Sequence, residues 1–507
     1  MVERLYRKRD ANDFNRLAIS GSFKEKGASF LKATLAAKQE AVVPVEVRKQ
    51  RPAWVVPLVL ISLLELFLLF ATSMTMEAKW SLFSFGCVII LWTTTSLNSA
   101  YVALGVVLFL VVTGTAKQEL LFESLASDVI WLMIGSFILG GALQVTGLAE
   151  RLTNLVISRA KNVTSLFTLL TIVVQLLAFF IPSTSGRAAV LLPVFHSLTA
   201  EIGSHRLTKA MAILLPTIIL VSTSSTIIGA GSHFIALDML KEFSGKEISF
   251  IEWLVWGLPF GIVASFLSCR IVLFLFLNKK ERKLPLVGEK ITLTLSRNEK
   301  YTVAVIAAMV LFWVTERLHG IEIATVTVIG AFLLTLPNAG VMKWKEGVQA
   351  VSWNLILFVG AAIALGKSLI ESGAAEWVMG RFFSVTDQLS GESTFPLLFV
   401  IIILSLTSHL YITSHTTRAV IFVPPLLYLA SSLQVNEVAV LFIGIVGMNY
   451  CLTFPVSSKA LLMFQEGGRE TFQPRDLLRL SLYVGFMHLV LMIVFYYVYW
   501  QWIGLSL

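Results

Sequence analysis

Residues 130–150 read IWLMIGSFILGGALQVTGLAE, and residues 355–376 read LILFVGAAIALGKSLIESGAAE. The two stretches share their glycine spacing, and the last two matches come after a slip of one residue. The matched pairs are Gly135 with Gly360, Gly141 with Gly366, Gly147 with Gly373 and Glu150 with Glu376. Self-similarity at a constant separation is typical of an internal repeat. These stretches therefore predict a chain built from two related halves.

A second pair of matching segments follows the glycine-rich stretches at nearly the same distance in each half. It reads STSGRAAVLLP at 183–193 and SHTTRAVIFVP at 414–424. Each half then continues into an apolar stretch that small polar residues interrupt, STSSTIIGAGSH at 222–233 and FPVSSKAL at 454–461. Irregular backbone at membrane depth survives only where protein or a water-filled cavity covers it. The interruptions therefore predict a cavity where the halves meet, which is where two-repeat transporters bind their substrates.

The composition indicates that lipid is the solvent of most of the chain. Of 507 residues, 56% are hydrophobic and 14% charged, and the mean hydropathy is +0.80, whereas soluble domains carry about 25% charged residues. Apolar runs of about 20 residues, long enough to cross a bilayer core, recur after Pro52. About eleven spans are predicted, starting near Trp54, Leu82, Ala100, Asp128, Thr208, Ile251, Tyr301, Ile321, Trp353, Asn436 and Leu480.

The expected fold is an all-α polytopic membrane protein in two inverted repeats, because an odd number of predicted crossings separates the matched segments. Each repeat is expected to hold a re-entrant helical hairpin, near 166–200 and 395–430, and a broken helix. The expected parts of the chain are a basic N-terminal arm at 1–53, a first repeat at 54–278, a basic linker at 279–300 and a second repeat at 301–507.

The placement of the positive charge predicts the topology. The formal net charge is +9, and Lys and Arg concentrate in 1–53 and 279–300. By the positive-inside rule both segments are cytoplasmic, so the N-terminus is expected in the cytoplasm and the chain in the plasma (inner) membrane. No nucleic-acid partner is expected. Two forms of the N-terminal arm stay open, an amphipathic helix along the membrane surface and a solvated tail.

Two arginines occupy the same position in the matched motifs. Arg187 and Arg418 each stand five residues into their motif, among Ser, Thr, Gly and aliphatic residues. An arginine at membrane depth costs at least about 2.5 kcal/mol on insertion scales, so it needs a partner. A carboxylate or sulfonate anion fits the planar guanidinium fork. The alternative is that each arginine pairs with a glutamate or a backbone carbonyl, or extends to the interface.

The residues around the arginines extend the candidate anion site. Small residues with hydroxyl groups, and one imidazole, suit a tight turn between two helices. The helix that follows such a turn presents free N–H groups, which attract an anion. The alternative is that the hydroxyl groups bond carbonyls of their own helix. The candidate substrate-binding residues are Ser183, Thr184, Ser185, Arg187, Ser414, His415, Thr416 and Arg418.

The interrupted stretches supply a second set of candidates. His233 and Lys459 are polar intrusions there, interpreted either as functional groups in the site or as residues at the mouth of a cavity. The candidate ion-binding or broken-helix residues are Gly229, Ser232, His233, Ser457, Ser458 and Lys459. The cysteines Cys87, Cys269 and Cys451 lack metal-ligand spacing and are interpreted as packing residues.

The sequence carries no enzyme signature. It has no Walker motif, no dinucleotide fingerprint and no metalloprotease spacing of histidines. We therefore expect a carrier rather than an enzyme, without a cofactor, although sodium stays open as a bound ion. A membrane receptor or sensor is the alternative from another class, but matched helix breaks in both halves supply two gates, which sensing alone does not require.

Over residues 54–507 the chain resembles the divalent anion/sodium symporter family, carriers of dicarboxylates, citrate and sulfate in the ion transporter superfamily. The family's hairpin tips carry Ser-Asn-Thr followed by a Leu/Val-Pro pair. The corresponding residues of this chain are Ser183-Thr184-Ser185 with Leu192-Pro193 in the first half, and Ser414-His415-Thr416 with Val423-Pro424 in the second half. The resemblance implies eleven spans, two inverted repeats, two hairpins, a homodimer, and a transport domain that moves as an elevator against a scaffold.

The chain departs from the family pattern where sodium would bind. Both tip asparagines are replaced, each tip motif gains an arginine, and the family's Gly-Thr-Pro-Pro-Asn-like loops are missing. We therefore expect a transporter of small organic or inorganic di- or trivalent anions, with a dicarboxylate or citrate expected first, that exchanges anions without sodium. Sodium-coupled symport is the alternative.

Overall fold

The computed structural model describes residues 54–71, 73–95, 97–148, 151, 158–286, 295–378, 394–466 and 471–507. The predicted N-terminal arm at 1–53 and Glu150 lie outside the described residues, as does 287–294 of the linker. The described part is helical and contains no β-strand, only an isolated β-bridge between Asn162 and Pro285. The prediction of an all-α membrane protein is confirmed.

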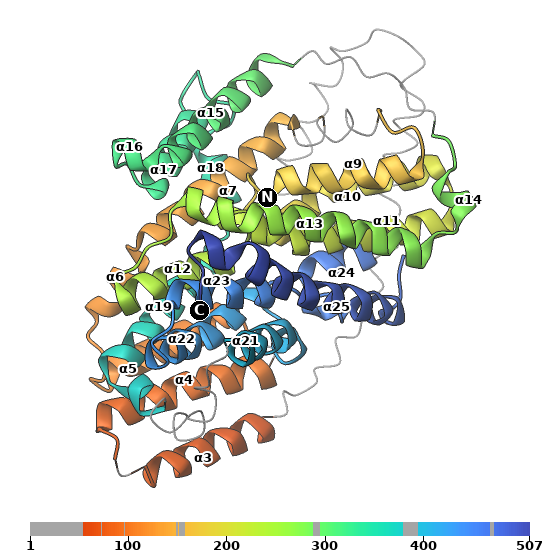
Figure 1. Ribbon diagram of the computed structural model, residues 1–507. Helices are drawn as coiled ribbons and strands as arrows, with labels where there is room; N and C mark the ends of the chain where they lie inside the picture. The colour runs from red at the N-terminus through yellow and green to blue at the C-terminus, as the bar shows by residue number, and fades with distance from the viewer. Residues whose placement is uncertain are drawn as a thin grey trace, which may run out of the picture. The chain divides into compact units, whose positions relative to one another are not determined.

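Helices occupy all eleven places where the sequence predicts spans (Figure 1). They are α3 (Val55–Leu69), α4 (Met76–Thr94), α5 (Ser99–Val112), α7 (Asp128–Thr146), α11 (His205–Val221), α13 (Phe250–Phe276), α15 (Arg297–Val314), α17 (Ile323–Leu334), α19 (Trp353–Glu371), α23 (Glu437–Met448) and α25 (Pro474–Val498). Among the described residues, five helices are long and apolar enough to cross a membrane alone: α7, α11 with its 3-10 extension, α13, α19 and α25. The number of crossings stays a prediction.

Each predicted hairpin region holds a helix–turn–helix. The first consists of α9 (Val163–Leu177) and α10 (Thr184–Ile202), and the second of α21 (Phe395–Thr407) and α22 (His415–Ser432). Each predicted broken helix is also interrupted: α11 leads to α12 (Gly231–Ser244), and α23 leads to α24 (Lys459–Glu466). The same order of elements thus follows both glycine-rich helices, α7 and α19.

The remaining elements are short. They are α6 (Glu119–Leu125), α14 (Lys279–Arg282), α16 (Glu316–His319) and α18 (Trp344–Ala350), together with 3-10 turns that include η2 (Ser222–Ser225), η3 (Ile227–Gly229), η4 (Ser408–Leu410) and η5 (Pro455–Ser457). The basic linker therefore begins with a helical turn, and the next long helix starts inside it at Arg297.

The helices separate into two groups by their contacts. The first helix group contains α3–α7 and α15–α19, and the second helix group contains α9–α14 and α21–α25. Contacts between the groups include α12 with α7 and α19, α22 with α19, and α13 with α15. Each group draws on both halves of the sequence, and both hairpins and both broken helices belong to the second group.

The matched glycines of α7 and α19 meet structural requirements. Gly147 and Gly373 end these helices at φ +69° and +72°, a left-handed conformation that favours glycine. A Cβ at Gly135 would lie 2.8 Å from Thr327 Cγ2, and one at Gly141 would lie 2.8 Å from Ala350 Cβ. Glycine at these positions therefore lets α7 pack closely against α17 and α18.

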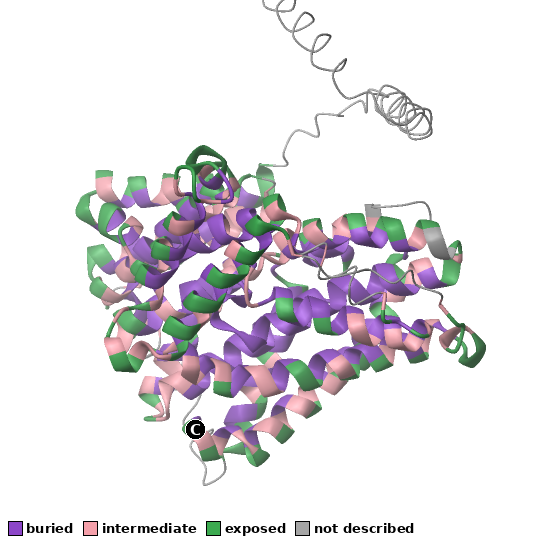
Figure 2. Cartoon of the chain, turned by 90° about the horizontal axis from the view of Figure 1, so that it is seen from above, coloured by how far each residue is buried: buried purple, intermediate pink, exposed green. Residues whose placement is uncertain are grey.

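Burial distinguishes the inside of the helix assembly from its lipid-facing helices (Figure 2). Every residue of α11 from Ala210 to Val221 is buried. By contrast, α3 buries only Pro57 and Leu68 and exposes large apolar side chains such as Phe67. Exposed apolar surface on this scale is unfavourable in water, and a bilayer covers it.

Candidate functional site

The tip of the first hairpin places Arg187 inside the protein. Ser183 caps α10 by accepting a hydrogen bond from the Gly186 backbone N–H at 3.2 Å. Arg187 follows one turn later and is fully buried. Its Nη2 donates to the Gly229 carbonyl at 2.7 Å and its Nη1 to Ser222 Oγ at 3.0 Å, so it reaches into the break between α11 and α12.

The tip of the second hairpin repeats this arrangement. Ser414 caps α22 by accepting from the Thr417 N–H at 3.3 Å. Arg418 is fully buried, and its Nη1 donates to the Tyr450 carbonyl at 3.1 Å, just beyond the end of α23. Each arginine therefore bonds a backbone carbonyl in the break of its own half, which is one of the partners that the sequence left open.

Neither guanidinium group has an anionic partner among the residues that the structure describes. In the described part of the chain, no ion pair involves either arginine. The buried Arg187 Nε and the Arg418 Nε and Nη2 also have no hydrogen-bond partner there. Buried polar atoms normally have partners, so these three donors need an explanation. An anionic ligand would supply acceptors for them.

The other residues of the two tips lie beside the arginines. Ser183, Thr184, Ser185, Ser414, His415 and Thr416 are all of intermediate exposure. Ser414 Oγ and Thr416 Oγ1 are 3.0 Å apart, and His415 Nε2 lies 3.0 Å from Cys451 Sγ, while His415 Nδ1 is buried without a partner. Among the described residues no hydrogen bond joins one tip to the other.

The packing of helices brings the hairpins and breaks of the two halves together. The α10 helix of the first hairpin packs against α24, and the α22 helix of the second hairpin packs against α12. A Cβ built on Gly231, at the start of α12, would lie 3.3 Å from Thr416 Cγ2. Each hairpin therefore meets the broken helix of the opposite half as well as its own.

The first break is held by residues that the motifs did not reveal. The Trp253 Nε1 donates to the Ser224 carbonyl at 3.1 Å. A Cβ on Gly257 of α13 would collide with that same carbonyl, and one on Gly261 would collide with Ser225 Oγ. These contacts join segments that are distant in the sequence, so the sequence contains no local signal for them.

Asn449 bridges the two breaks, and the sequence analysis missed it. Its Nδ2 lies 2.6 Å from His233 Nε2, and its Oδ1 accepts from Ser232 Oγ at 2.9 Å. Because the amide nitrogen can only donate, His233 Nε2 is the acceptor. The His233 Nδ1–H then faces the carbonyls of Thr226 and Ile227, each at 3.1 Å. The buried His233 is therefore a neutral structural link.

The second break contains the remaining candidates. Ser458 Oγ accepts from the Ala460 N–H at 3.2 Å, while Ser457 Oγ is buried without a partner. Lys459 is exposed, and both interpretations of it, as a functional group in the site and as a residue at the mouth of a cavity, stay predictions. Cys87, Cys269 and Cys451 are buried free thiols, and none of the described residues form a group of His, Cys, Asp and Glu suited to a metal.

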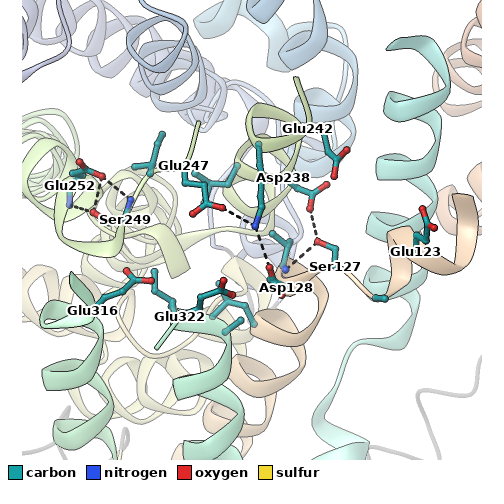
Figure 3. A pocket seen from close by; sticks show the side chains of 18 of the residues that line it. Glu123, Ser127, Asp128, Asp238, Glu242, Glu247, Ser249, Glu252, Glu316 and Glu322 are labelled. Atoms are coloured by element: carbon teal, nitrogen blue, oxygen red, sulfur yellow. Dashed lines mark hydrogen bonds and ion pairs between the residues drawn. The ribbon is translucent and has the colours of Figure 1, made fainter. Parts of the chain in front are cut away.

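A cavity of about 530 Å³ lies elsewhere, between the two helix groups (Figure 3). Four polar bridges cross beside it from one group to the other: Ser127–Asp238 at 2.5 Å, Lys241–Asp128 at 3.4 Å, Lys367–Glu242 at 2.8 Å and Arg317–Glu252 at 2.5 Å. The lining acids are Glu123, Asp128, Asp238, Glu242, Glu247, Glu252, Glu316 and Glu322, and the lining bases are Lys241, Arg317 and Lys367. Such a cavity repels anions, so it differs in kind from the site at the arginines.

The apolar helices, two hairpins and two interrupted helices define a multi-pass membrane transporter. The model of a sodium:sulfate symporter transmembrane region matches residues 50–506. The chain belongs to the sodium:sulfate symporter family, as the resemblance predicted, and it is an anion transporter of a family that consists of transporters.

Named relatives include both modes of transport. A citrate/succinate antiporter of Escherichia coli is 21% identical over 388 residues, 73% of this chain and 78% of the relative. A sodium-dependent dicarboxylate transporter of Staphylococcus saprophyticus is 24% identical over 399 residues, 72% and 76% of the two chains. A membrane protein of Cupriavidus necator is 26% identical over 414 residues, 77% and 78% of the two chains.

A solved structure is similar to this fold. The YdaH transporter of Alcanivorax borkumensis superimposes with a TM-score of 0.53 at 13% identity, covering 82% of this chain and 96% of that one. The similarity concerns the fold of a transporter and carries no information about the transported anion.

Proposed function

We propose that this protein exchanges small di- or trivalent organic anions, dicarboxylates or citrate, across the membrane without sodium. The observation that carries the proposal is the position of the two guanidinium groups. Arg187 and Arg418 each lie between a hairpin tip and a helix break, and each donates to a carbonyl of that break. The substrate would bind where their remaining donors, the hairpin hydroxyls and the helix N-termini converge.

Fixed cations at the breaks account for independence from sodium. In transporters with broken helices, the unwound carbonyls hold the coupling cation and the half-helix N-termini face the anionic substrate. Here the carbonyls of Gly229 and Tyr450 accept hydrogen bonds from guanidinium groups. A sodium ion would have to compete with a covalently attached charge for the same oxygens. The arginines therefore supply the positive charge that a bound cation supplies in symporters.

The charge balance favours exchange over one-way transport. The two arginines carry one positive charge each, and the two half-helix N-termini contribute about half a positive charge each. The sum of roughly three positive charges is close to what a di- or trivalent anion neutralises. Without the anion these charges stay unpaired in a medium of low dielectric constant. The empty carrier should therefore reorient slowly, while the loaded carrier moves readily. One of the relatives is named as a citrate/succinate antiporter, which is an exchanger of such anions.

The two helix groups suggest how the site is moved. The second helix group holds both hairpins, both breaks and both arginines, and it contacts the first group through α12, α13 and α22. The interface between them is polar at the acidic cavity, where the bridges can break and re-form in water. We infer an elevator movement of the second group against the first, in a homodimer of the inner membrane with a cytoplasmic N-terminus.

Counterflow in proteoliposomes tests the proposal. Uptake of labelled succinate, malate, citrate and sulfate would be measured into vesicles that are either empty or preloaded with the unlabelled anion. The proposal predicts rapid uptake of at least one di- or trivalent anion into preloaded vesicles and little into empty ones. Equal uptake into empty vesicles under a sodium gradient would instead identify a symporter, and the Staphylococcus relative is named as sodium-dependent.

A further inference from the structure

A small basic cavity lies at the end of the second helix group beside the basic linker. It has a volume of about 250 Å³ and is lined by Thr164, Arg270, Leu273, Lys279, Arg282 and Lys283. Four of these six residues are basic and none is acidic. Among the described residues, no ion pair or side-chain hydrogen bond satisfies Arg270, Lys279 or Lys283. The cavity is therefore strongly positive, and none of the described residues supplies it with a counter-ion.

The walls of this basic cavity are held in place by the fold. Arg282 donates from Nε and Nη2 to the Leu277 carbonyl, at 3.0 and 2.9 Å, and so closes the end of α13. Thr164 Oγ1 donates to the Arg282 carbonyl at 3.0 Å, and the Val163 N–H donates to the Leu284 carbonyl at 3.3 Å. These bonds fix α14 against the start of α9. The charges thus surround a defined cavity rather than a loose surface loop.

The nearby acid is directed elsewhere. Glu281 lies within α14, but its carboxylate accepts from the Asn278 N–H at 2.8 Å and pairs with Arg206 at 3.4 Å. It caps its own helical turn instead of neutralising the cavity. The positive charge of the cavity is consequently available to a ligand.

An apolar lipid-facing stripe leads up to the cavity along α13. Val263, Leu267, Arg270 and Phe274 share one face of the helix by their spacing, and the three apolar members are 38%, 40% and 69% exposed. Arg270 precedes the helix end at Phe276 by about 9 Å of rise, so its stem lies along this stripe and its head can reach the cavity. A ligand that joins an anionic head to an apolar tail fits both surfaces.

We propose that this basic cavity binds the phosphate headgroup of an anionic phospholipid whose acyl chains lie along the exposed face of α13. Free inorganic phosphate offers the same charge, but it makes no use of the apolar stripe. The basic linker places the cavity on the predicted cytoplasmic side, and basic pockets between membrane helices on that side are suited to lipid headgroups. The site lies away from both helix breaks and does not depend on which anion is transported.

Native mass spectrometry of the delipidated full-length protein tests the site. Phosphatidylglycerol and phosphatidylcholine with identical acyl chains would be titrated separately into the wild type and into the triple variant Arg270→Gln, Lys279→Gln, Lys283→Gln. We expect the wild type to bind phosphatidylglycerol roughly tenfold more tightly than phosphatidylcholine, and the triple variant to lose this preference, because each base near an anionic headgroup contributes measurably. An unchanged preference in the triple variant overturns the proposal.

Matched controls separate the site from general electrostatics. The variant Arg297→Gln, Lys300→Gln, Lys345→Gln removes three exposed bases from elsewhere and should keep the preference. Loss of preference in both variants to the same degree would mean that net charge alone acts, which rejects the site. Arg270→Lys keeps the charge and should keep the preference for phosphatidylglycerol. Displacement of the lipid by millimolar inorganic phosphate would assign the cavity to a free anion and overturn the choice of a lipid.

Discussion

At the scale of single residues, the account depends on two buried guanidinium groups that none of the described carboxylates neutralises. Each makes hydrogen bonds to the protein, but these use only part of the five donors that a guanidinium offers. A buried charge without a counter-ion is costly, and removal from water is repaid only by good partners. We therefore propose that Arg187 and Arg418 are kept at a cost to stability that binding of an anion would recover.

The first prediction concerns anion affinity. Arg187→Gln and Arg418→Gln should each weaken binding of the transported anion roughly 10- to 100-fold, because a hydrogen bond to a charged group contributes about 1.5–3 kcal/mol. Calorimetric titration of the purified protein with the anion measures this loss, and Arg297→Gln, an exposed arginine, serves as the control. Unchanged affinity for the anion in both variants would mean that neither arginine contributes to the binding site.

The second prediction concerns the bridge between the breaks. Asn449→Ala should lower the thermal unfolding midpoint by several degrees, because Ser232 and His233 would lose a buried partner at a cost of about 1–3 kcal/mol. The exposed Asn298→Ala should leave the midpoint nearly unchanged. Thermal melting followed by fluorescence provides the comparison, and equal midpoints for the two variants would count against a structural role for Asn449.

The sequence predicted part of the site and missed another part for a physical reason. Arg187 and Arg418 could be found because the internal repeat aligns them within a short motif. Asn449 and Cys451 could not, because each gains its role through a contact across the fold, such as the 216 residues between Asn449 and His233. A single sequence carries no signal for a contact of that range.

At the scale of elements, the apolar pattern of the sequence predicts where the helices lie but not where their first turns begin. The apolar run predicts a span from Leu82, but α4 begins at Met76 because Thr75 accepts a hydrogen bond from the Ala78 N–H at 3.2 Å. Likewise Ser296 and Glu299 form a capping box that starts α15 at Arg297 rather than Tyr301. Polar caps extend helices beyond the apolar stretch, so hydropathy places the middle of a helix better than its start.

The third prediction concerns the close approach of α13 to the first break. Gly257→Ala should destabilise the protein by about 1–3 kcal/mol and reduce transport, because the added Cβ collides with the Ser224 carbonyl. Gly105→Ala in α5 meets nothing within 4 Å and should be neutral or slightly stabilising. Melting midpoints and uptake rates of the two variants measure the difference. Equal melting midpoints and uptake rates of the two variants would mean that α13 does not pack closely against the first break.

At the scale of the whole molecule, the two helix groups meet through the packing of α12 and α22 against the first group and through the polar bridges beside the acidic cavity. Ser127 of the first group lies within 2.5 Å of Asp238 in the second, whereas Ser81 and Ser368, 2.9 Å apart, both belong to the first group. A movement of one group against the other must separate the first pair and leave the second pair together.

The fourth prediction tests that movement by crosslinking. Oxidation of a Ser127→Cys, Asp238→Cys variant should block anion uptake, and reduction should restore it, because the crosslink joins the two groups. The matched Ser81→Cys, Ser368→Cys variant should transport at the same rate before and after oxidation. Uninterrupted uptake by the crosslinked Ser127–Asp238 variant would exclude a movement that separates the groups at this point.

The dependence of exchange on sodium tests the central claim most directly, since the claim is that fixed guanidinium charges replace bound cations. Uptake of labelled anion would be measured into proteoliposomes preloaded with the unlabelled anion. The external sodium concentration would be lowered in steps to zero, with choline replacing the sodium at each step. The account predicts the same initial rate at every sodium concentration, including zero. A rate that falls to background without sodium, and rises again as sodium is added, would contradict it.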